Sequence, residues 1–372
     1  MKIVNYIPTA SFFVGGGERV PLEQTKYLKR LGVDISLMTL KTSKETDVFK
    51  TFKKENPDIP ILYLEATHMI KGFANVELTH ELTHEIYLSL TRQANAIISK
   101  NDFDVAITHY APGAFSVPNN VHQVLFLHGV PKEYQKINDI ALNHADQLVA
   151  VSNSVKQGWI DLFKYNGEIE VIHNGIDTEK FKITEEVELD IDILYVGRLI
   201  EIKGVQDLIK AIGITNKKQK DLIKSAHIVG TGPYREELEK LTKSLNLDSI
   251  VHFDGYVEDS DLLDFYRRSK VCVFPSYAKE GVLTTLLEAS SFGKAVITSN
   301  CCGMTDLVRD GFNGLLFKPQ DSKKLSEKLL MVLQDKNLQK KLGKKAREEI
   351  VKNWSWESAA GRLLNSIKNS YA

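Results

Sequence analysis

The sequence has no excess of charge of either sign, no long hydrophobic run and few cysteines. Lys and Arg total 48 and Asp and Glu also total 48, and we find no basic stripe that would bind nucleic acid. No run approaches the roughly 18 apolar residues of a membrane span, and the N-terminus has the pattern of a first strand rather than a signal peptide. A membrane protein and a dedicated nucleic-acid binder are therefore not expected.

The three cysteines are Cys272, Cys301 and Cys302, an odd number with two of them adjacent in the chain. Such a set does not form a disulfide framework, so we expect a reducing, cytoplasmic compartment and thiols that are buried as small hydrophobes. Hydrophobic residues make up 43% and charged residues 26% of the 372 residues, as in ordinary globular proteins. This length predicts two domains, each with its own core.

Short β-branched runs alternate with longer helical stretches in both halves of the chain, a pattern typical of a parallel sheet covered by helices. We predict an α/β fold with two tandem Rossmann-like, doubly wound domains. The boundary is expected in the acidic, poorly patterned stretch after Phe181, which gives domains at 1–182 and 183–355. In the first domain, strands are predicted at 3–7, 33–40, 104–110, 123–128, 147–152 and 168–173, with helices at about 18–31, 76–99, 136–145 and 153–163.

The second domain repeats the alternation. Strands are predicted at 191–197, 225–230, 250–253, 271–275, 295–299 and 314–317, with helices at 203–213, 234–245, 259–268 and near 284–292. A last helix at about 355–370 is not needed by the second sheet. In such folds ligands bind at the carboxyl ends of the strands, so two sheets would present their binding edges to one central cleft.

Three kinds of motif have competing interpretations. Gly15, Gly16 and Gly17 follow the first strand and could approach a phosphate or a sugar at a helix N-terminus, but Val20 stands where a dinucleotide fingerprint needs glycine. Residues 80–84, HELTH, match a zinc signature, although a five-residue match also arises by chance. Pairs of the form D-x-D occur at 102–104, 190–192 and 259–261, where caps or solvated turns are the better interpretation than a metal site.

The second half carries more specific signals. Arg198 and Lys203 flank the end of its first strand and the start of the next helix, where a diphosphate could lie. Gly230 in the following turn would let the backbone approach a nucleoside, although a tight turn alone would also select it. The segment FDGYV, 253–257, offers main-chain amides beside the apolar surface of Tyr256 and Val257, which suits a base.

The segment EGVLTTLLE, 280–288, follows the strand VCVFP. Eight residues do not bring two helical positions onto one narrow stripe, so we place Glu280 in the loop and Glu288 on the helix. The N–H groups from Val282 to Thr284 would then face an anion, while the Glu288 carboxylate could accept hydrogen bonds from two ribose hydroxyls.

In this order, the motifs resemble the retaining nucleotide-sugar glycosyltransferases of GT-B fold, family 4. The resemblance covers nearly the whole chain and is most specific over 171–317. It is carried by GGGER (15–19), FLHG (126–129), VSNSV (151–155), VIHNGID (171–177), VGRLIEIKG (196–204), VGTGPY (229–234), FDGYV (253–257), EGVLTTLLEA (280–289) and GMTDLVRDGFNGLLF (303–317).

The resemblance implies a role for each matched position. Arg198 and Lys203 would hold the donor diphosphate, Glu288 the ribose, and Glu280 the donor hexose. The remaining assignments concern the backbone and the first domain. Val282 and Leu283 would bind hydroxyls and phosphate through their amides, Tyr256 and Val257 would line the base, His128 would sit near the anomeric carbon, Gly16 and Gly17 would close over the phosphates, and a C-terminal helix, 356–372, would cross back to the first domain.

The implied activity is transfer of a hexose or N-acetylhexosamine, with retention, from a nucleoside diphosphate sugar to a glycan or lipid-linked glycan. UDP is the expected nucleotide, no metal or other cofactor is expected, and the process would be polysaccharide biosynthesis. Two departures from the family pattern are Val282-Leu283, where Phe-Gly is common, and Asp306, where Glu is common. The first leaves the donor sugar open.

Alternatives remain within and outside this fold. A nucleotide-sugar epimerase or hydrolase, or a phosphorylase, would use the same architecture, and a zinc peptidase would rest on HELTH alone. His109, at another strand end, is a second candidate on the acceptor side and is expected to face the cleft. Residues 41–75 are expected to form variable acceptor-side loops, whose lysines leave a weak peripheral contact with the inner face of a membrane open.

Overall fold

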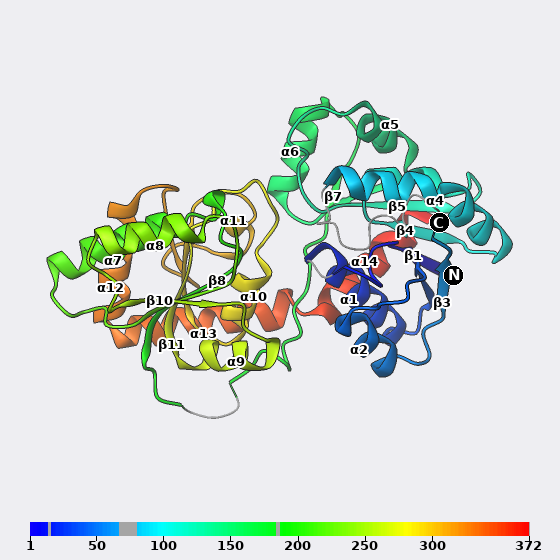
Figure 1. Cartoon of the computed structure of the whole chain (residues 1–372). Helices are drawn as coiled ribbons and strands as arrows, with labels where there is room; N and C mark the ends of the chain where they lie inside the picture. Colours follow the sequence, from blue (N-terminus) through cyan, green and yellow to red (C-terminus); the bar gives the residue numbers. More distant parts are fainter. Residues whose placement is uncertain (14–15, 67–79, 184–186, 372) are drawn as a thin grey trace. The chain divides into compact units, whose positions relative to one another are not determined.

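The computed structural model describes residues 1–13, 16–66, 80–183 and 187–371. The chain divides into two compact units, the first formed by Met1–Gly175 with Trp356–Ala372 and the second by Ile176–Ser355. Each unit has a parallel sheet with helices packed on it (Figure 1). The predicted α/β class with two Rossmann-like domains is confirmed.

The first unit is built on a seven-stranded sheet in the order β3-β2-β1-β4-β5-β6-β7. Its paired strands are all parallel. The central strands are buried on both faces because helices cover both, which explains their continuous apolar runs. The strands are β1 (Lys2–Tyr6), β2 (Asp34–Leu40), β3 (Ile61–Leu64), β4 (Val105–Thr108), β5 (His122–Leu127), β6 (Gln147–Ala150) and β7 (Glu170–Val171).

The helices of the first unit begin where the sequence supplies caps. Ser152 accepts a hydrogen bond from the Val155 amide at the start of α6, and Thr46 caps α2 in the same way. The helices are α1 (Gly16–Arg30), α2 (Asp47–Glu55), α4 (His80–Lys100), α5 (Lys136–His144), α6 (Asn153–Phe163) and α14 (Trp356–Tyr371), with a short 3-10 turn, η1 (Ala111–Ser116).

The C-terminal helix α14 packs in the core of the first unit, as predicted for 356–372. In Figure 1 it lies beside α1, and the rings of Tyr27 and Trp356 stack with their centroids 6.3 Å apart. One apolar face of α14 is buried in the same cluster as β1 and β4, and it consists of Trp356, Ala359, Ala360, Leu363, Leu364 and Ile367. The helix therefore completes the first core although it follows the second in the chain.

One prediction for the first half is wrong in part. Residues 41–75 are not all loop, because α2 and the edge strand β3 lie within them; Phe49 and Phe52 bury their rings on the apolar face of α2. The apolar run of β3 has only four residues, which is too short to distinguish an edge strand from a loop by pattern. Residues 67–75 lie outside the described part of the chain.

The second unit has a six-stranded sheet in the order β10-β9-β8-β11-β12-β13, again with parallel pairing throughout. Its strands are β8 (Ile191–Val196), β9 (Ala226–Val229), β10 (Val251–Gly255), β11 (Ser269–Phe274), β12 (Ala295–Ser299) and β13 (Leu315–Phe317). Its helices are α7 (Val205–Lys218), α8 (Arg235–Ser244), α9 (Asp259–Arg268), α10 (Thr284–Ser291), α11 (Met304–Leu307), α12 (Ser322–Gln334) and α13 (Lys336–Asn353), with a 3-10 turn, η2 (Glu201–Lys203).

Helix α7 starts two residues later than predicted because η2 and Gly204 precede it. Gly204 has φ +73°, and a Cβ atom there would lie 2.2 Å from the carbonyl oxygen of Pro275. Only glycine fits this close approach between the turn after β8 and the end of β11. The turn fixes where Lys203 leaves the backbone.

The boundary between the units lies at Gly175/Ile176, seven residues before the predicted 182/183. Residues 176–181 already belong to the second unit, because Ile176 N–H donates to the Trp354 carbonyl at 2.8 Å. The Phe181 carbonyl accepts from Arg347 at 2.9 Å and from the Ser291 hydroxyl at 2.7 Å. The acidic stretch that the sequence predicts as the linker follows residues 176–181.

No helix in the described part of the chain is long and apolar enough to cross a membrane.

The packing of α14 predicts an asymmetric effect of alanine substitutions along it. Leu363 is fully buried and Asn365, two residues on, is exposed. Leu363→Ala should lower the free energy of unfolding by about 2–5 kcal/mol, because it leaves a cavity in the first core. Urea denaturation monitored by tryptophan fluorescence measures this change, and Asn365→Ala is the matched control. Equal transitions for both variants would contradict the packing of α14.

Candidate active site

Three neighbouring strands of the second unit end beside the predicted donor residues. β8 is followed by Gly197 and Arg198, β9 by Gly230, and β11 by the loop that leads to Glu280. Because β9, β8 and β11 are adjacent and parallel, their carboxyl ends lie on one edge of the sheet. The fold therefore gathers residues that are up to 83 positions apart in the sequence, from Gly197 to Glu280.

Lys203 and Glu280 form an ion pair at this edge. The Lys203 Nζ atom lies 2.6 Å from Glu280 Oε1, and the Ser276 hydroxyl donates to the same oxygen at 3.0 Å. Lys203 is buried, while the Glu280 side chain is 29% exposed. Two residues predicted to contact different parts of a donor are thus brought together, and each neutralises the other's charge.

The loop that carries Glu280 is fixed by contacts with residues 301–303. The Gly303 amide donates to the Glu280 carbonyl at 3.1 Å. A Cβ atom on Gly303 would lie 2.3 Å from the carbonyl carbon of Gly281, so only glycine allows the two segments to approach this closely. The carboxylate of Glu280 is consequently held on a braced loop.

Arg198 is exposed, and its main-chain carbonyl accepts a hydrogen bond from the Tyr195 hydroxyl at 3.0 Å. Burial raises the pKa of Tyr195, and the nearby Glu280 carboxylate adds to this effect. The phenol stays protonated and keeps donating. The guanidinium group of Arg198 lies at the surface, where an anionic ligand could reach it.

Glu288 lies on α10, as predicted, and is buried. Its Oε2 atom accepts a hydrogen bond from the Tyr266 hydroxyl at 2.8 Å, and Tyr266 is itself fully buried. Burial and the Glu288 carboxylate both raise the pKa of Tyr266. The tyrosine therefore acts as a donor that fixes the orientation of the carboxylate.

The start of α10 has no side-chain cap. Leu283 is the N-cap residue and offers no side-chain acceptor to the first turn. The amides predicted to bind an anion, those of Val282 to Thr284, thus stand at a helix start whose first-turn N–H groups need acceptors.

Gly230 is required by the backbone conformation, whereas the predicted base-binding residues are at least partly exposed. Gly230 has φ +134°, and a Cβ atom there would lie 1.9 Å from the Gly197 carbonyl oxygen, so the turn requires glycine with or without a ligand. Tyr256 is 69% exposed and Val257 is half-buried. The exposed ring and the nearby strand end leave this surface accessible.

The first unit contributes a pair of histidines at neighbouring strand ends. His128 follows β5, and its Nε2 atom lies 2.9 Å from Nδ1 of His109, which follows β4. Burial lowers the pKa of His128 to about 4 and holds the pKa of His109 well below its ordinary value. The expectation that His109 faces an acceptor is wrong, because its side chain is fully buried behind His128.

The glycine motif lies partly outside the described residues. Gly16 and Gly17 form the first turn of α1, and Gly15 is not described. The HELTH segment opens α4. The side chains of His80 and Glu81 are not described, and His84 is buried. Within the described residues, no group of three or more His, Cys, Asp or Glu side chains could hold a metal ion.

The acidic pairs of the D-x-D form contact the protein's own donors. Asp104 accepts from the Lys2 amide, Asp192 accepts from the Lys224 amide and from Lys270, and Asp190 pairs with Arg268. The remaining pair, at 259–261, lies in the first turn of α9. The cap interpretation therefore fits only the pair at 259–261; it is wrong for Asp192, which is buried in β8 and paired with Lys270.

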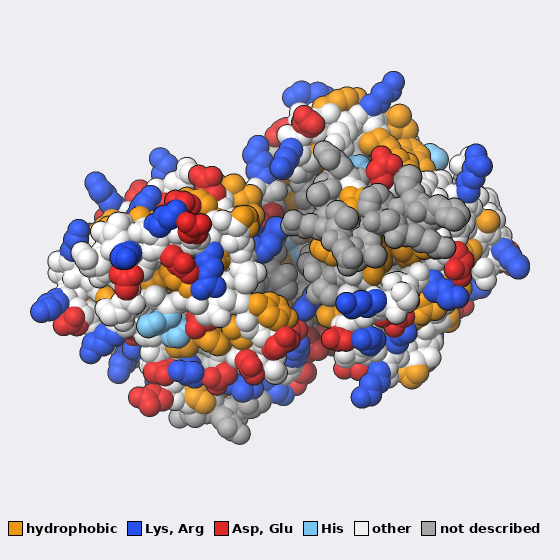
Figure 2. Space-filling model, in the orientation of Figure 1, with side chains coloured by type: hydrophobic (Ala, Val, Ile, Leu, Met, Phe, Trp, Pro, Cys, Tyr) orange, Lys and Arg blue, Asp and Glu red, His pale blue; other side chains and the backbone are white. Residues whose placement is uncertain are grey.

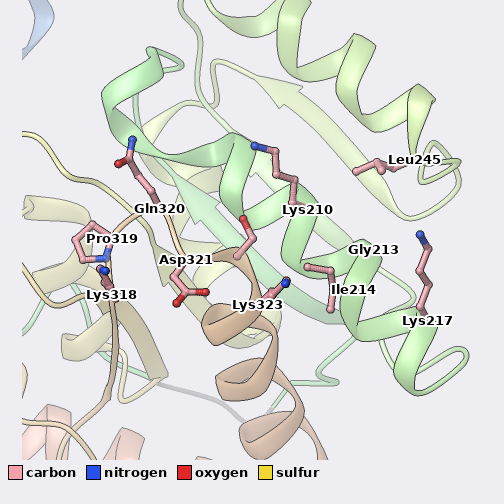
Figure 3. Close-up of a pocket in the computed structure, with 11 residues that line it drawn as sticks. Lys210, Gly213, Ile214, Lys217, Leu245, Lys318, Pro319, Gln320, Asp321 and Lys323 are labelled. Carbon is pink, nitrogen blue, oxygen red and sulfur yellow. The ribbon is translucent and has the colours of Figure 1, made fainter.

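Two cavities differ in chemical character. A cavity of about 260 Å³ in the first unit includes His128 in its lining, together with His84, Tyr110, Phe126, Asn138 and Trp159. A larger, open cavity of about 700 Å³ lies between α7 and the start of α12 in the second unit (Figure 3). Its lysines, Lys210, Lys217, Lys318 and Lys323, do not point to a common position, and none of them is a predicted site residue.

The visible surface has no extended patch of one charge. In Figure 2, Lys and Arg side chains alternate with Asp and Glu over both units. Both signs of charge are thus interspersed on this face.

The cysteines Cys301 and Cys302 adjoin the Glu280 loop. All three cysteines are free, but only Cys272 is fully buried; Cys301 and Cys302 are half-buried, so the expectation of buried thiols is wrong for these two. The Cys302 thiol donates to Cys301 Sγ at 3.0 Å, and this hydrogen bond lowers the pKa of Cys301. Burial raises the pKa of Cys272 to about 11.

We expect the thiols to differ in reactivity. Cys301 should be alkylated by iodoacetamide with a half-maximal rate at a pH below the ordinary thiol pKa of about 8.5, because only the thiolate reacts. Cys272 should stay unmodified in the folded protein. Peptide mass spectrometry across a pH series measures both rates, and Cys302→Ser is the control. A higher midpoint for Cys301 than for Cys302 would contradict the assignment.

Comparison with known families places both halves of the chain. The model of "Glycosyltransferase Family 4" matches residues 14–180, and the model of "Glycosyl transferases group 1" matches residues 176–349. Together the two matches span residues 14–349, which include most of both units.

Relatives of similar sequence carry the same kind of name. An uncharacterized glycosyltransferase of Methanocaldococcus jannaschii is 30% identical over 230 residues, which are 60% of this chain and 58% of the relative. An uncharacterized glycosyltransferase of Haemophilus influenzae is 24% identical over 374 residues, which are 95% of this chain and 99% of the relative. The alignment thus spans little more than half of the archaeal relative.

Solved structures share the fold along the whole chain. Sucrose-phosphate synthase of Thermosynechococcus elongatus has a TM-score of 0.80 at 21% identity, covering 99% of this chain and 98% of that one. HepE of Anabaena, solved in complex with UDP, has a TM-score of 0.77 at 19% identity, covering 99% and 100%. With the matched families and the geometry of the strand ends, these findings show that the chain belongs to the GT-B glycosyltransferases and resembles family 4.

Proposed function

We propose that this chain is a retaining glycosyltransferase that moves a hexose or an N-acetylhexosamine from a nucleoside diphosphate sugar to a glycan or lipid-linked glycan. The observation that carries the proposal is the convergence of Arg198, the Lys203–Glu280 pair and the start of α10 at one sheet edge. Cations and free helix amides at one place suit a diphosphate. UDP is the proposed nucleotide, since HepE was solved with UDP and with UDP-glucose.

Each residue of the second unit then has a proposed task. The diphosphate is held by Arg198, Lys203 and the amides of Val282 to Thr284, and its approach draws Lys203 away from Glu280. Glu280, released from part of its ion pair, accepts hydrogen bonds from hydroxyls of the transferred sugar. Glu288, oriented by Tyr266, accepts from the ribose hydroxyls.

The nucleotide is also bound through backbone and apolar contacts. Tyr256 and Val257 line the base, Gly230 lets the chain pass close to the nucleoside, and Gly16 and Gly17 contact the phosphates. His128 is the proposed polar partner of the transferred sugar. These tasks follow the family resemblance, and the exposure of Tyr256 is consistent with them.

The chemistry needs stabilisation of a leaving diphosphate and of an oxocarbenium-like carbon. Fixed cations and helix amides aimed at the phosphate oxygens supply the first. With retention, the acceptor hydroxyl attacks from the face of the leaving group, and the departing phosphate takes its proton. No protein base is then required, which agrees with the low pKa of His128.

A donor screen tests the proposal. The full chain is mixed with UDP- and GDP-sugars, and the melting temperature is recorded, because a ligand at about 100 times its Kd stabilises the protein by about 2.7 kcal/mol. The donor that binds is then incubated with acceptor glycans, and the product's anomeric configuration is read by NMR. Release of nucleotide with no acceptor present would favour an epimerase or hydrolase. No shift with any sugar nucleotide would contradict the proposal.

Substitutions at the proposed donor site should separate binding from transfer. Glu288→Ala should raise the donor KM by at least about tenfold, since it removes a charged acceptor from the ribose. Lys203→Ala should lower kcat by about 100-fold, because it removes the positive charge that would stabilise the leaving diphosphate. Steady-state kinetics measure both effects. Lys210→Ala, on the same unit but outside the site, is the control and should behave as the parent. Parent-like kinetics for all three variants would sink the site assignment.

Transfer should not depend on a divalent metal, since cations of the chain and helix amides are proposed to bind the diphosphate. We expect activity in excess EDTA to equal the untreated rate, and added Mg²⁺ or Mn²⁺ to change it less than twofold. The assay is nucleotide release in the presence of acceptor. Complete loss in EDTA with recovery on adding metal would instead support a metal-bound diphosphate.

A further inference from the structure

Three side chains form a continuous hydrogen-bonded line across adjacent strands of the first unit. Asn5 lies in β1, His109 follows β4 and His128 follows β5, and these strands are neighbours in the sheet. His109 Nε2 lies 2.6 Å from Asn5 Oδ1, and His109 Nδ1 lies 2.9 Å from His128 Nε2. Asn5 and His109 are fully buried, while His128 is half-buried at the end of the line.

The orientation of the Asn5 amide follows from its other partners. Its Nδ2 atom lies 3.0 Å from the Pro21 carbonyl and 2.9 Å from Thr25 Oγ1. The carbonyl can only accept, and the Thr25 hydroxyl already donates its hydrogen to that carbonyl at 2.7 Å. Both partners therefore need a donor, so the amide nitrogen faces α1 and the amide oxygen faces His109.

This orientation determines where the protons of both histidines lie. Asn5 Oδ1 accepts, so His109 must carry its proton on Nε2. Burial keeps His109 neutral, which leaves a lone pair on its Nδ1. His128 must then donate through Nε2–H, and its own lone pair is on Nδ1. Within the described residues, no hydrogen bond to His128 Nδ1 is found.

We propose that Asn5 and His109 are positioning residues that hold His128 in one neutral tautomer, so that His128 meets the substrate only as a hydrogen-bond acceptor through Nδ1. The inference rests on the proposed function for the identity of the substrate. In this form His128 cannot act as an acid and places no positive charge beside an oxocarbenium-like carbon, where a cation would oppose the developing charge.

The cavity beside His128 has matching chemistry. Asn138, also in its lining, is almost fully buried, and its Oδ1 atom has no hydrogen-bond partner within the described residues. His128 and Asn138 thus line one cavity of about 260 Å³. An O–H group of a sugar ring would donate to His128 Nδ1, whereas a deprotonated carboxylate or phosphate has no hydrogen to donate.

NMR of the free protein tests the tautomer directly. Long-range ¹H–¹⁵N spectra of the ¹⁵N-histidine-labelled full chain distinguish the two neutral tautomers and the imidazolium, and His109→Asn and His128→Asn assign the signals. We expect His128 and His109 both to be neutral and protonated on Nε2 at pH 7. Protonation of His128 on Nδ1, or an imidazolium at pH 7, would overturn the inference.

Variants connect the tautomer with catalysis. His109→Phe keeps a ring beside Phe126 but removes the acceptor, and should lower kcat about 10- to 100-fold with donor KM changed less than threefold. His109→Asn restores an acceptor oxygen near the Nδ1 position and should recover most of kcat. Thr39→Val removes a buried hydrogen bond to the Pro8 carbonyl in the same sheet and is the control for packing. Equal losses in His109→Asn and His109→Phe would contradict the acceptor role.

Asn5→Asp gives a pH readout that packing alone does not change. A carboxylate opposite Nε2 raises the pKa of His109, and protonated His109 donates from both nitrogens, which forces His128 into the other tautomer. The activity of this variant should fall as the pH drops through the raised pKa of His109, whereas the activity of the parent should not fall in that pH range. Within the described residues, the other titratable groups that line the cavity beside His128 are Tyr110 and His84, so Asn5→Asp combined with His84→Gln should keep the same loss of activity at low pH. Parallel pH profiles of Asn5→Asp and the parent would count against the inference.

The two kinds of experiment separate the claims. The NMR result does not require any substrate, so the expected tautomer in a protein without transferase activity would refute the proposed function alone. An active transferase with His128 protonated on Nδ1 would refute the positioning role alone.

Discussion

Parallel strand pairing is the constraint on which the rest of the structure depends. In each sheet, parallel order sends every strand-to-helix connection to one edge, so residues distant in sequence meet there. In the second unit this brings Lys203 within 2.6 Å of Glu280. In the first it aligns Asn5, His109 and His128 on three neighbouring strands. The polar groups at both edges are held by rigid elements, which preorganises them for a ligand.

The site charges are balanced by partners in the protein itself. Lys203 is paired with Glu280, and Glu288 accepts a hydrogen bond from the buried Tyr266. Burying an ion without a partner costs several kcal/mol, so these contacts let charged groups exist at a partly buried edge. An anionic donor would compete with the Glu280 carboxylate for Lys203. Donor binding would therefore weaken the ion pair that holds the Glu280 side chain.

Much of the fold could be predicted from sequence because local patterns determine it. The strands with continuous apolar runs, the helix at 153–163 and the surplus helix at about 355–370 all follow from periodicity and turn signals. The edge strand β3 and helix α2 were missed because their apolar runs are short, and the boundary was placed late because Ile176 and Phe181 are anchored by long-range contacts.

The candidate site was likewise predictable only in part. The motifs give the candidate residues, but neither the Lys203–Glu280 pair nor the burial of His109 behind His128 could be predicted from them. Such contacts depend on side-chain geometry between strands, about which spacing in the sequence says nothing. The conformation of the Gly204 turn could not be predicted for the same reason, because it depends on the close approach of Gly204 to the Pro275 carbonyl.

The central claim is that a nucleoside diphosphate binds at the strand-end loops of the second unit. Hydrogen exchange with mass spectrometry, with and without the nucleotide that raises the melting temperature most, locates the bound ligand directly. We expect slower exchange in peptides that cover 197–204 and 280–288, and unchanged exchange in peptides that cover Lys217 and Lys323 in the larger cavity. Protection confined to that cavity, with none at 280–288, would contradict it.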